Sequence, residues 1–309
     1  MKELELLLAD DTAGDPMTGL KWSRKTTHTL SKELAARGVA ACPNTVGAAL
    51  GEMAFSLRVN RKSIAETRHP DRDRQFQYFS GVKQSFLDRG LPVISVDSKK
   101  REQIGDFYNA GRTYRREGDD VWAHDFPSLA DGVALPYGIY ELARNQGSVV
   151  VGTSRDTPAF AVDAIELWLS CYGWWHYPHM TELLILCDAG GSNGYRPRLW
   201  KYALSLRLAR EHGIAVTVCH YPPGASKWNP VDHRLFSFIS LNWAGVPLRN
   251  YETVLNRIRT TTTSTGLTVD ATLHQTTYQK GVKIDDQQMN QINIHHHDTL
   301  PAWNYTIEP

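Results

Sequence analysis

The sequence lacks the features that mark secreted, membrane-spanning and metal-cluster proteins. It has only four cysteines in 309 residues, and none forms a C-x-x-C pair, so neither a zinc site nor a disulfide framework is indicated. No stretch approaches the roughly 20 apolar residues that a membrane span requires, and no basic region of a signal peptide opens the chain. We therefore expect a cytoplasmic protein with reduced thiols and no membrane partner.

An excess of charge of either sign is also missing. The formal net charge is +1, from 34 basic and 33 acidic residues, which excludes a uniformly basic coat but is compatible with local basic patches for nucleic acid. Hydrophobic residues make up 41% and charged residues 22% of the chain, close to the averages for globular proteins. This length and composition predict one substantial domain plus a smaller appendage.

Residues 26–53 predict two short helices. Leu30 and Leu34 form an i, i+4 apolar stripe in the first, and Pro43 suits the first turn of the second, where its missing N–H costs nothing. Two such helices around a short glycine-containing turn resemble a helix-turn-helix, whose second helix enters the DNA major groove. We therefore expect residues 1–80 to be a helical, helix-turn-helix-like DNA-binding region.

A locally basic stretch follows these helices. Arg58, Arg61 and Lys62 are its candidates for contacts with DNA phosphates, because basic side chains there are interleaved with few acidic ones. A solvated linker is an equally weighted alternative.

From Pro92 onward the pattern alternates between strands and helices. Apolar runs predict strands at 92–97, 104–109, 148–151, 183–187 and 214–219, and helical periodicity predicts helices at 159–169, 196–211 and from 229 onward. This order, β-β-β-α-β-α-β-α, predicts an α/β domain with a mixed sheet flanked by helices. We assign it residues 81–265, with an ordered insertion at about 110–145 and a C-terminal extension at 266–309.

Three aspartates are placed where they can converge. Asp97 and Asp188 end the first and fourth predicted strands, where open α/β sheets bind ligands, and Asp232 starts the last predicted helix. Each one alone is more often a turn residue or a helix N-terminal carboxylate. Their joint placement favours a catalytic site, because Mg²⁺ prefers oxygen ligands and two such ions can promote phosphoryl transfer.

Cationic and aromatic residues surround the three aspartates. Surface charge and core packing are the ordinary roles of such residues, but their placement suits contacts with DNA, and a tryptophan can stack on an unpaired base for about 1–3 kcal/mol. The candidates are Lys99, Lys100, Arg196, Lys227, Trp228, His233 and Arg234.

The segments around these aspartates resemble a known family. The strings VISVDSKK at 93–100, CDAGGSNGYR at 187–196 and SKWNPVDHRLFS at 226–237 resemble the three acidic blocks of the Rhodopirellula-type (ISAzo-type) insertion-sequence transposases. The similarity runs from near Leu20 to Tyr305. One departure is the third acid, which is typically Glu in the family and is Asp232 here.

The resemblance implies a DDE transposase of the ribonuclease H-like superfamily. Its implied catalytic and metal-binding residues are Asp97, Asp188 and Asp232, holding two Mg²⁺ ions or Mn²⁺ in their place. The implied activity is 3′-end cleavage at the terminal inverted repeats of a bacterial element, followed by strand transfer into target DNA. A homo-oligomer on paired DNA ends, in the cytoplasm and on the nucleoid, is the expected assembly.

Two other functions are compatible with the same residues. A truncated or inactive transposase would act only as a DNA-binding regulator, for which the short start of the chain and Asp232 are the motivation. A related ribonuclease H-like nuclease would cut DNA without joining it.

Overall fold

The computed structural model describes residues 2–11, 13–14, 21–22, 25–53, 55, 70–222, 224–225 and 228–309. Its internal contacts divide the chain into two units, Met1–Ile64 and Ala65–Pro309. No helix in these described ranges is both long enough and apolar enough to cross a membrane.

The first unit is a small helical bundle. Its elements are α1(Lys2–Asp11), β1(Ala13–Gly14), β2(Lys21–Trp22), α2(Thr27–Ala36) and α3(Pro43–Glu52). The side chain of Thr26 caps α2 by accepting from the Thr29 N–H, and Gly38, with φ of 83°, follows the helix end. Both helices predicted between residues 26 and 53 are therefore confirmed.

A leucine-rich core holds the first unit together. Six apolar side chains from α1, α2 and α3 are buried there: Leu4, Leu7, Leu8, Leu30, Leu34 and Val46. Burial of such a cluster supplies the favourable free energy for packing three short helices. The predicted phosphate contacts Arg58, Arg61 and Lys62 lie outside the described residues.

The second unit is built on a nine-stranded mixed sheet. Its strands are β3(Val93–Ser98), β4(Glu102–Ile104), β5(Gly132–Glu141), β6(Gln146–Gly152), β7(Glu182–Cys187), β8(Ala215–His220), β9(Thr268–His274), β10(Asn293–His296) and β11(Asn304–Glu308). The order is β10-β11-β8-β7-β3-β5-β6-β9, with β4 paired to β5. Strands β3, β7 and β8 are parallel, whereas β5 runs antiparallel to both β3 and β6. The central strands β6-β5-β3-β7-β8 confirm the expected mixed sheet.

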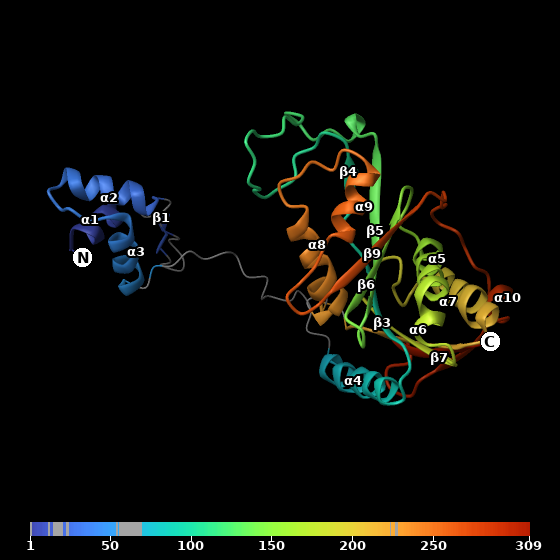
Figure 1. Ribbon diagram of the computed structural model, residues 1–309. Coiled ribbons are helices and arrows are strands. Elements are labelled where there is room, and N and C mark those ends of the chain that lie inside the picture. Colours follow the sequence, from blue (N-terminus) through green and yellow to red (C-terminus); the bar gives the residue numbers. More distant parts are fainter. Residues whose placement is uncertain are drawn as a thin grey trace. The chain divides into compact units, whose positions relative to one another are not determined.

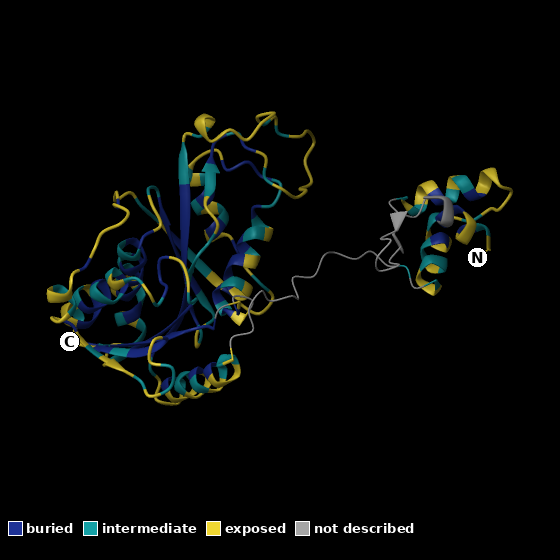
Figure 2. Ribbon diagram, turned by 180° about the vertical axis from the view of Figure 1, so that it is seen from behind, coloured by how far each residue is buried: buried dark blue, intermediate teal, exposed yellow. Residues whose placement is uncertain are grey.

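Helices cover both faces of this sheet, as seen in Figure 1. One face carries α5(Pro158–Trp168), η2(Leu169–Gly173), α6(Trp174–His176), α7(Arg198–Leu204) and η3(Ser205–Arg210). The other carries α4(Arg72–Asp88), η5(Asp232–Phe236), α8(Ser237–Asn242) and α9(Tyr251–Arg259). The short helices η1(Pro127–Leu129) and α10(Asp286–Met289) lie in connections. Figure 2 shows the strands buried between these layers.

The prediction for the second core strand was wrong. The strand expected at 104–109 ends at Ile104, and the strand that pairs with β3 is β5, inside the expected insertion. β5 contains Gly132, Pro136 and Gly138, which weaken a strand signal. Its last eight residues are all buried, so it shows no alternation of polar and apolar side chains.

Residues 266–309 are part of the sheet. β9 pairs in parallel with β6 at one edge, and β11 pairs with β8 toward the other, followed by β10. Tyr305 and Ile307 on β11 are fully buried. The segment that the sequence left unplaced therefore extends the sheet at both ends.

Helix α4 belongs to the second unit. Phe79 and Phe86 on one face of the helix are buried against residues of β3, β7 and β8. Gln75 and Asn304 exchange two side-chain hydrogen bonds of 2.8 and 2.7 Å, and Gln75 also donates to the His220 carbonyl at 2.8 Å. These contacts fasten α4 to the sheet, which explains why the structural division falls at residue 64 and not at 80.

Two glycines allow the helix that begins at Asp232 to lie directly on the sheet. A Cβ atom on Gly138 would be 2.5 Å from the Phe236 ring, and one on Gly147 would be 2.4 Å from a Leu235 methyl group. Distances this short cannot be accommodated without movement of the packed helix. The absence of a side chain at Gly138 of β5 and at Gly147 of β6 therefore lets η5 pack closely on the sheet.

We predict that Gly138→Ala lowers the free energy of unfolding by about 1–3 kcal/mol, because it overpacks a filled interface. Gly81→Ala on α4 is the control, since its Cβ would meet nothing within 4 Å and alanine favours a helix. Urea unfolding of both variants measures the difference. Equal stability of the two variants would show that η5 is not held in place by this glycine.

Candidate active site

Strand register brings the first two aspartates to one edge of the sheet. β3 and β7 are parallel neighbours, and Val96 pairs with Cys187. Asp97 and Asp188 are the next residues of their chains, so they occupy equivalent positions at the carboxyl ends. Val96 and Cys187 belong to the core on the α5 face, and because side chains alternate along a strand, both aspartates lie on the opposite face.

A buried hydrogen-bond bridge positions the segment that carries the third aspartate. Ser95 lies two residues before Asp97, and its hydroxyl donates to Asn229 Oδ1 and accepts from the Val231 N–H at 3.3 Å. Asn229, which is fully buried, also donates from Nδ2 to Asp188 Oδ1 at 3.3 Å. One amide therefore links β3, the end of β7 and the start of the helix.

Asp232 is the first residue of the π-helix η5. Its backbone N–H donates to the Asn229 carbonyl at 3.2 Å, so its position depends on the same bridge. Wide π turns inside helices are frequent at functional sites. The structure thus brings the third aspartate to the edge where the first two end.

Burial raises the pKa of all three carboxyl groups, and nearby negative charge adds to this effect for Asp97 and Asp188. Burial, followed by the negative charges of Asp188 and Asp232, raises the pKa of Asp97 to about 8. Burial and then Asp232 raise the pKa of Asp188 to about 6. Burial also raises the pKa of Asp232, against the lowering effects of His233 and Lys99. The charges of Asp188 and Asp232 therefore reach Asp97, as expected for carboxylates that lie at the same edge of the sheet.

A second buried chain of hydrogen bonds holds the backbone at Asp188. His220 Nδ1 lies 3.0 Å from the Asp188 carbonyl oxygen, and His220 Nε2 lies 3.1 Å from the Tyr305 hydroxyl. A carbonyl oxygen can only accept, so the Nδ1–H of His220 donates to it. Nε2 of the neutral ring then accepts from the Tyr305 hydroxyl, which itself accepts from Trp200 Nε1 at 3.0 Å. Burial lowers the pKa of His220 to about 4, which keeps the ring neutral. The C-terminal strand thereby supports the second aspartate.

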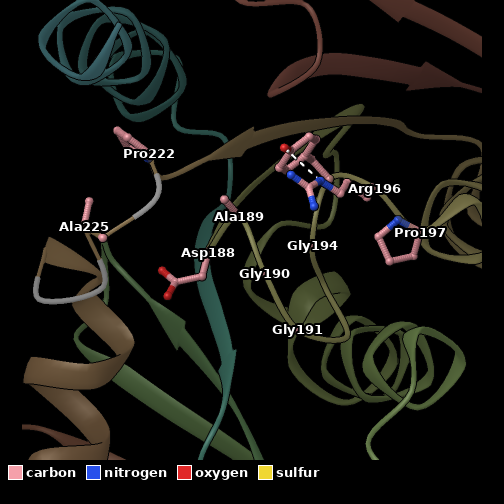
Figure 3. A pocket seen from close by; sticks show the side chains of 11 residues that line it. Asp188, Ala189, Gly190, Gly191, Gly194, Arg196, Pro197, Pro222 and Ala225 are labelled. Atoms are coloured by element: carbon pink, nitrogen blue, oxygen red, sulfur yellow. Dashed lines mark hydrogen bonds between the residues drawn. The ribbon is translucent and has the colours of Figure 1, made fainter. Parts of the chain in front are cut away.

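A pocket of about 570 Å³ opens beside Asp188. Figure 3 shows the Asp188 carboxylate at one side of it, with the glycine-rich turn and Arg196 across from it. Pro222 and Ala225 form the wall near the carboxylate. An extended substrate therefore has access to this acid.

The residues available for a metal ion are the three carboxylates. Within the part of the chain that the structure describes, no three Asp, Glu, His or Cys side chains are grouped closely enough to hold one ion by themselves. This arrangement fits Mg²⁺, which is usually bound by one or two carboxylates together with substrate phosphates. The donor chemistry and the accumulated negative charge both suit a divalent cation.

Two lysines follow Asp97 and differ in their surroundings. Lys99 pairs with Glu102 at 3.2 Å and lies over the Trp243 ring, 4.6 Å from its centroid. Its positive charge nevertheless lowers the pKa of Asp232, against the larger raising effect of burial. Lys100 is exposed and lines a neighbouring pocket, so it is free to meet a ligand.

Arg196 and His233 flank the acids from two other segments. Arg196 lines the pocket beside Asp188 and packs on the Tyr195 ring, 5.3 Å from its centroid. His233 is exposed beside the third aspartate. Lys227 lies outside the described residues.

Trp228 and Arg234 make contacts within the protein. Trp228 remains 53% exposed and meets Phe76 edge to face, with ring centroids 5.9 Å apart. Arg234 donates to the Tyr140 hydroxyl at 3.4 Å, and Tyr140 pairs with Ser95, not with Asp97. The contact of Arg234 with β5 therefore lies level with Ser95, two residues before Asp97.

Sequence reasoning missed the residues that hold the acids in place. Ser95 is a polar residue inside an apolar strand, and Asn229 precedes the proline of a helix start, so both had a local signal. His220 and Tyr305 had none, because their partnership depends on the pairing of β8 with β11. These four residues complete the description of the site.

Comparison with known proteins identifies a family. A family model described as "Rhodopirellula transposase DDE domain" matches residues 3–309. The structure resembles the Mos1 transposase paired-end complex with left transposon end, with a TM-score of 0.43, 15% identity, and coverage of 82% of this chain and 68% of that chain. The Mos1 strand transfer complex gives a TM-score of 0.42 at 18% identity, covering 82% of this chain and 67% of that chain. No curated protein sequence matches the chain significantly.

The raised carboxyl pKa values predict how stability depends on pH without metal. A carboxyl whose pKa is raised on folding binds its proton more tightly in the folded state, so stability is highest at low pH. It then falls as the pH rises from the usual value of 3.8 toward the folded value of about 8 for Asp97. We therefore expect the melting temperature of metal-free protein to fall between about pH 5 and 8.

Asp97→Asn should remove most of this fall, since the amide carries no charge at any of these pH values. Mg²⁺ should raise the melting temperature of the unaltered protein more at pH 8 than at pH 5. Differential scanning fluorimetry measures both effects. A steeper fall in Asp97→Asn than in the unaltered protein would contradict the assigned charge repulsion.

Proposed function

Because the chain belongs to the Rhodopirellula transposase DDE domain family, we propose that this DDE transposase cuts and joins DNA at Asp97, Asp188 and Asp232. The observation that carries the assignment is the placement of Asp97 and Asp188 side by side at the carboxyl ends of β3 and β7, close enough to Asp232 for its negative charge to raise the pKa of both. A purely structural cluster would gain nothing from such repulsion. A site that binds metal ions and phosphates gains the ligands it needs.

The proposed cofactor is a pair of Mg²⁺ ions, with Mn²⁺ as a substitute. When bound, divalent ions at such a site activate the attacking oxygen and stabilise the leaving oxygen of a phosphodiester. Asp97, Asp188 and Asp232 would hold them, and the carboxylates act as ligands and not as nucleophiles. Because their pKa values are raised without metal, a bound cation would stabilise the charged form of these carboxylates.

The chain's own side chains keep the carboxylates oriented. Asn229 holds one oxygen of Asp188 and fixes the start of the helix behind Asp232. The neutral His220 holds the Asp188 carbonyl from the other side. Since phosphoryl transfer depends mainly on positioning and charge stabilisation, these contacts are expected to matter for rate as well as for stability.

The proposed substrates are the terminal inverted repeats of the protein's own insertion sequence and a target duplex. Water cuts the element end to release a 3′-hydroxyl, which then attacks target DNA. Helices α2 and α3 are the proposed DNA-binding pair, as in a helix-turn-helix. A homo-oligomer would pair two ends in the bacterial cytoplasm, on the nucleoid.

Asp188→Asn is predicted to abolish Mg²⁺-dependent cleavage of an element-end duplex while leaving its affinity for that duplex within about twofold, because a ligand is lost but the phosphate contacts remain. Gel-based cleavage and fluorescence anisotropy measure the two properties. Retained cleavage would refute the proposed site.

The same assays separate the alternatives. Unaltered protein that binds ends but neither cuts nor joins them with Mn²⁺ would be a regulator. Protein that cuts but yields no joined product would be a nuclease.

Asn229→Ala is predicted to raise the Mg²⁺ concentration needed for half-maximal cleavage by about 10-fold, as expected when a residue that orients a metal ligand is removed. It should also destabilise the fold by about 1–3 kcal/mol, because buried partners lose their hydrogen bonds. The control is Asn109→Ala, whose amide bridges the carbonyls of Trp243 and Val246 instead. If both variants need the same Mg²⁺ concentration, Asn229 contributes to stability and does not orient a metal ligand.

A further inference from the structure

The connection between β9 and α10 presents two lysines from a firmly held loop. Tyr278, near its start, is buried and donates from its hydroxyl to Asp163 at 2.6 Å. Ile284, at its end, is also buried, and its carbonyl accepts from Arg198 at 3.2 Å. The residues between these anchors, Gln279 to Lys283, are all exposed.

The loop that follows β6 meets this connection. The Ser154 hydroxyl donates to the Thr276 carbonyl at 3.0 Å and accepts from the Tyr278 N–H at 3.2 Å. Arg155, the next residue, is exposed and lines the same pocket as Lys280. Hydrogen bonds between two distant segments thus bring their cationic side chains to one surface.

Three pockets follow one another from Asp188 to this surface. The pocket beside Asp188 shares Gly191 and Pro197 with a second pocket of about 660 Å³, which includes Lys280 and Lys283. The second shares Asp156 and Lys280 with a third of about 690 Å³, which includes Arg155. Because the first and second pockets, and the second and third, have lining residues in common, the three adjoin one another and together make a groove along this surface.

Positive charge dominates the far end of the groove. The third pocket is lined by five cationic side chains and one carboxylate: Lys99, Lys100, Arg101, Arg155, Lys280 and Asp156. Among the described residues, Lys100, Arg101, Arg155, Lys280 and Lys283 have no carboxylate partner, whereas Lys99 is paired with Glu102. Unpaired cations held together repel one another, and a polyanion relieves that repulsion.

We propose that the cationic groove, defined by Lys100, Arg101, Arg155, Lys280 and Lys283, binds the sugar–phosphate backbone of the DNA strand that leaves the active site. The inference rests on the proposed function, which places the scissile phosphate at Asp188. A single small anion would use only one pocket. A strand uses the whole path, because its phosphates recur along its length.

The test compares two variants that each remove two positive charges. Arg155→Gln/Lys280→Gln alters the groove. The matched control, Lys83→Gln/Arg257→Gln, alters α4 and α9 at residues that line none of the three pockets. The full chain is titrated with a short mixed-sequence DNA duplex over a series of salt concentrations.

The groove variant should bind the duplex about 10-fold more weakly at low salt, and its slope of log affinity against log salt should fall by about 1.8, which corresponds to about 0.9 for each lost phosphate contact. In the control variant, both the affinity and the salt slope should stay close to those of the unaltered protein. Equal behaviour of the two variants overturns the proposal.

Cleavage and joining assays identify which DNA lies in the groove. Loss of both reactions assigns it to the element end, whereas loss of joining alone assigns it to target DNA. If the unaltered protein cuts ends and the groove variant binds and reacts as well as it does, the proposed groove is wrong and the proposed active site stands. If the unaltered protein does not cut ends but the groove variant still binds DNA more weakly, the proposed active site is wrong and the proposed groove stands.

Discussion

Gathering three carboxylates at a partly buried sheet edge opposes folding electrostatically, and the surrounding structure is organised to hold them there. The charges of Asp188 and Asp232 raise the pKa of Asp97, and the charge of Asp232 raises that of Asp188. Repulsion of this kind would separate side chains on mobile loops. Here Asp97 and Asp188 cannot separate, because the parallel register of β3 and β7 fixes their backbones. The resulting negative potential is what makes the edge selective for cations and, through them, for phosphates.

Two buried polar networks keep this edge rigid from opposite sides. Ser95 and Asn229 connect β3 to the helix start on one face, while Tyr305 and His220 support the end of β7 from the C-terminal strand. Buried polar groups are stabilising only when every partner is present. Strand β11 is therefore not a dispensable tail, since its loss would leave His220 without the hydroxyl that donates to its Nε2.

The position of Asp97 and Asp188 at strand ends could be predicted from the sequence, whereas the partnership of His220 with Tyr305 that supports one of them could not. Asp97 and Asp188 end apolar runs, which is a local pattern, and their placement needed no knowledge of strand order. β5 escaped detection because Gly132, Pro136 and Gly138 interrupt its strand signal, although Gly138 is the residue that a strand under a closely packed helix requires. Arg155 and Lys280 are 125 positions apart in sequence, and only the parallel pairing of β6 with β9 brings their loops together.

The same close packing bears on the third acid. Asp is one methylene shorter than the Glu that is typical of the family, so its carboxylate reaches less far from the backbone. A shorter side chain can serve the same ion if the backbone that carries it lies nearer. Gly138 and Gly147 allow Phe236 and Leu235 of η5 to rest on β5 and β6 without an intervening side chain, and the effect of Asp232 on the pKa of both other aspartates shows that its charge reaches them. An aspartate at this position is therefore compatible with a working site and does not by itself favour an inactive protein.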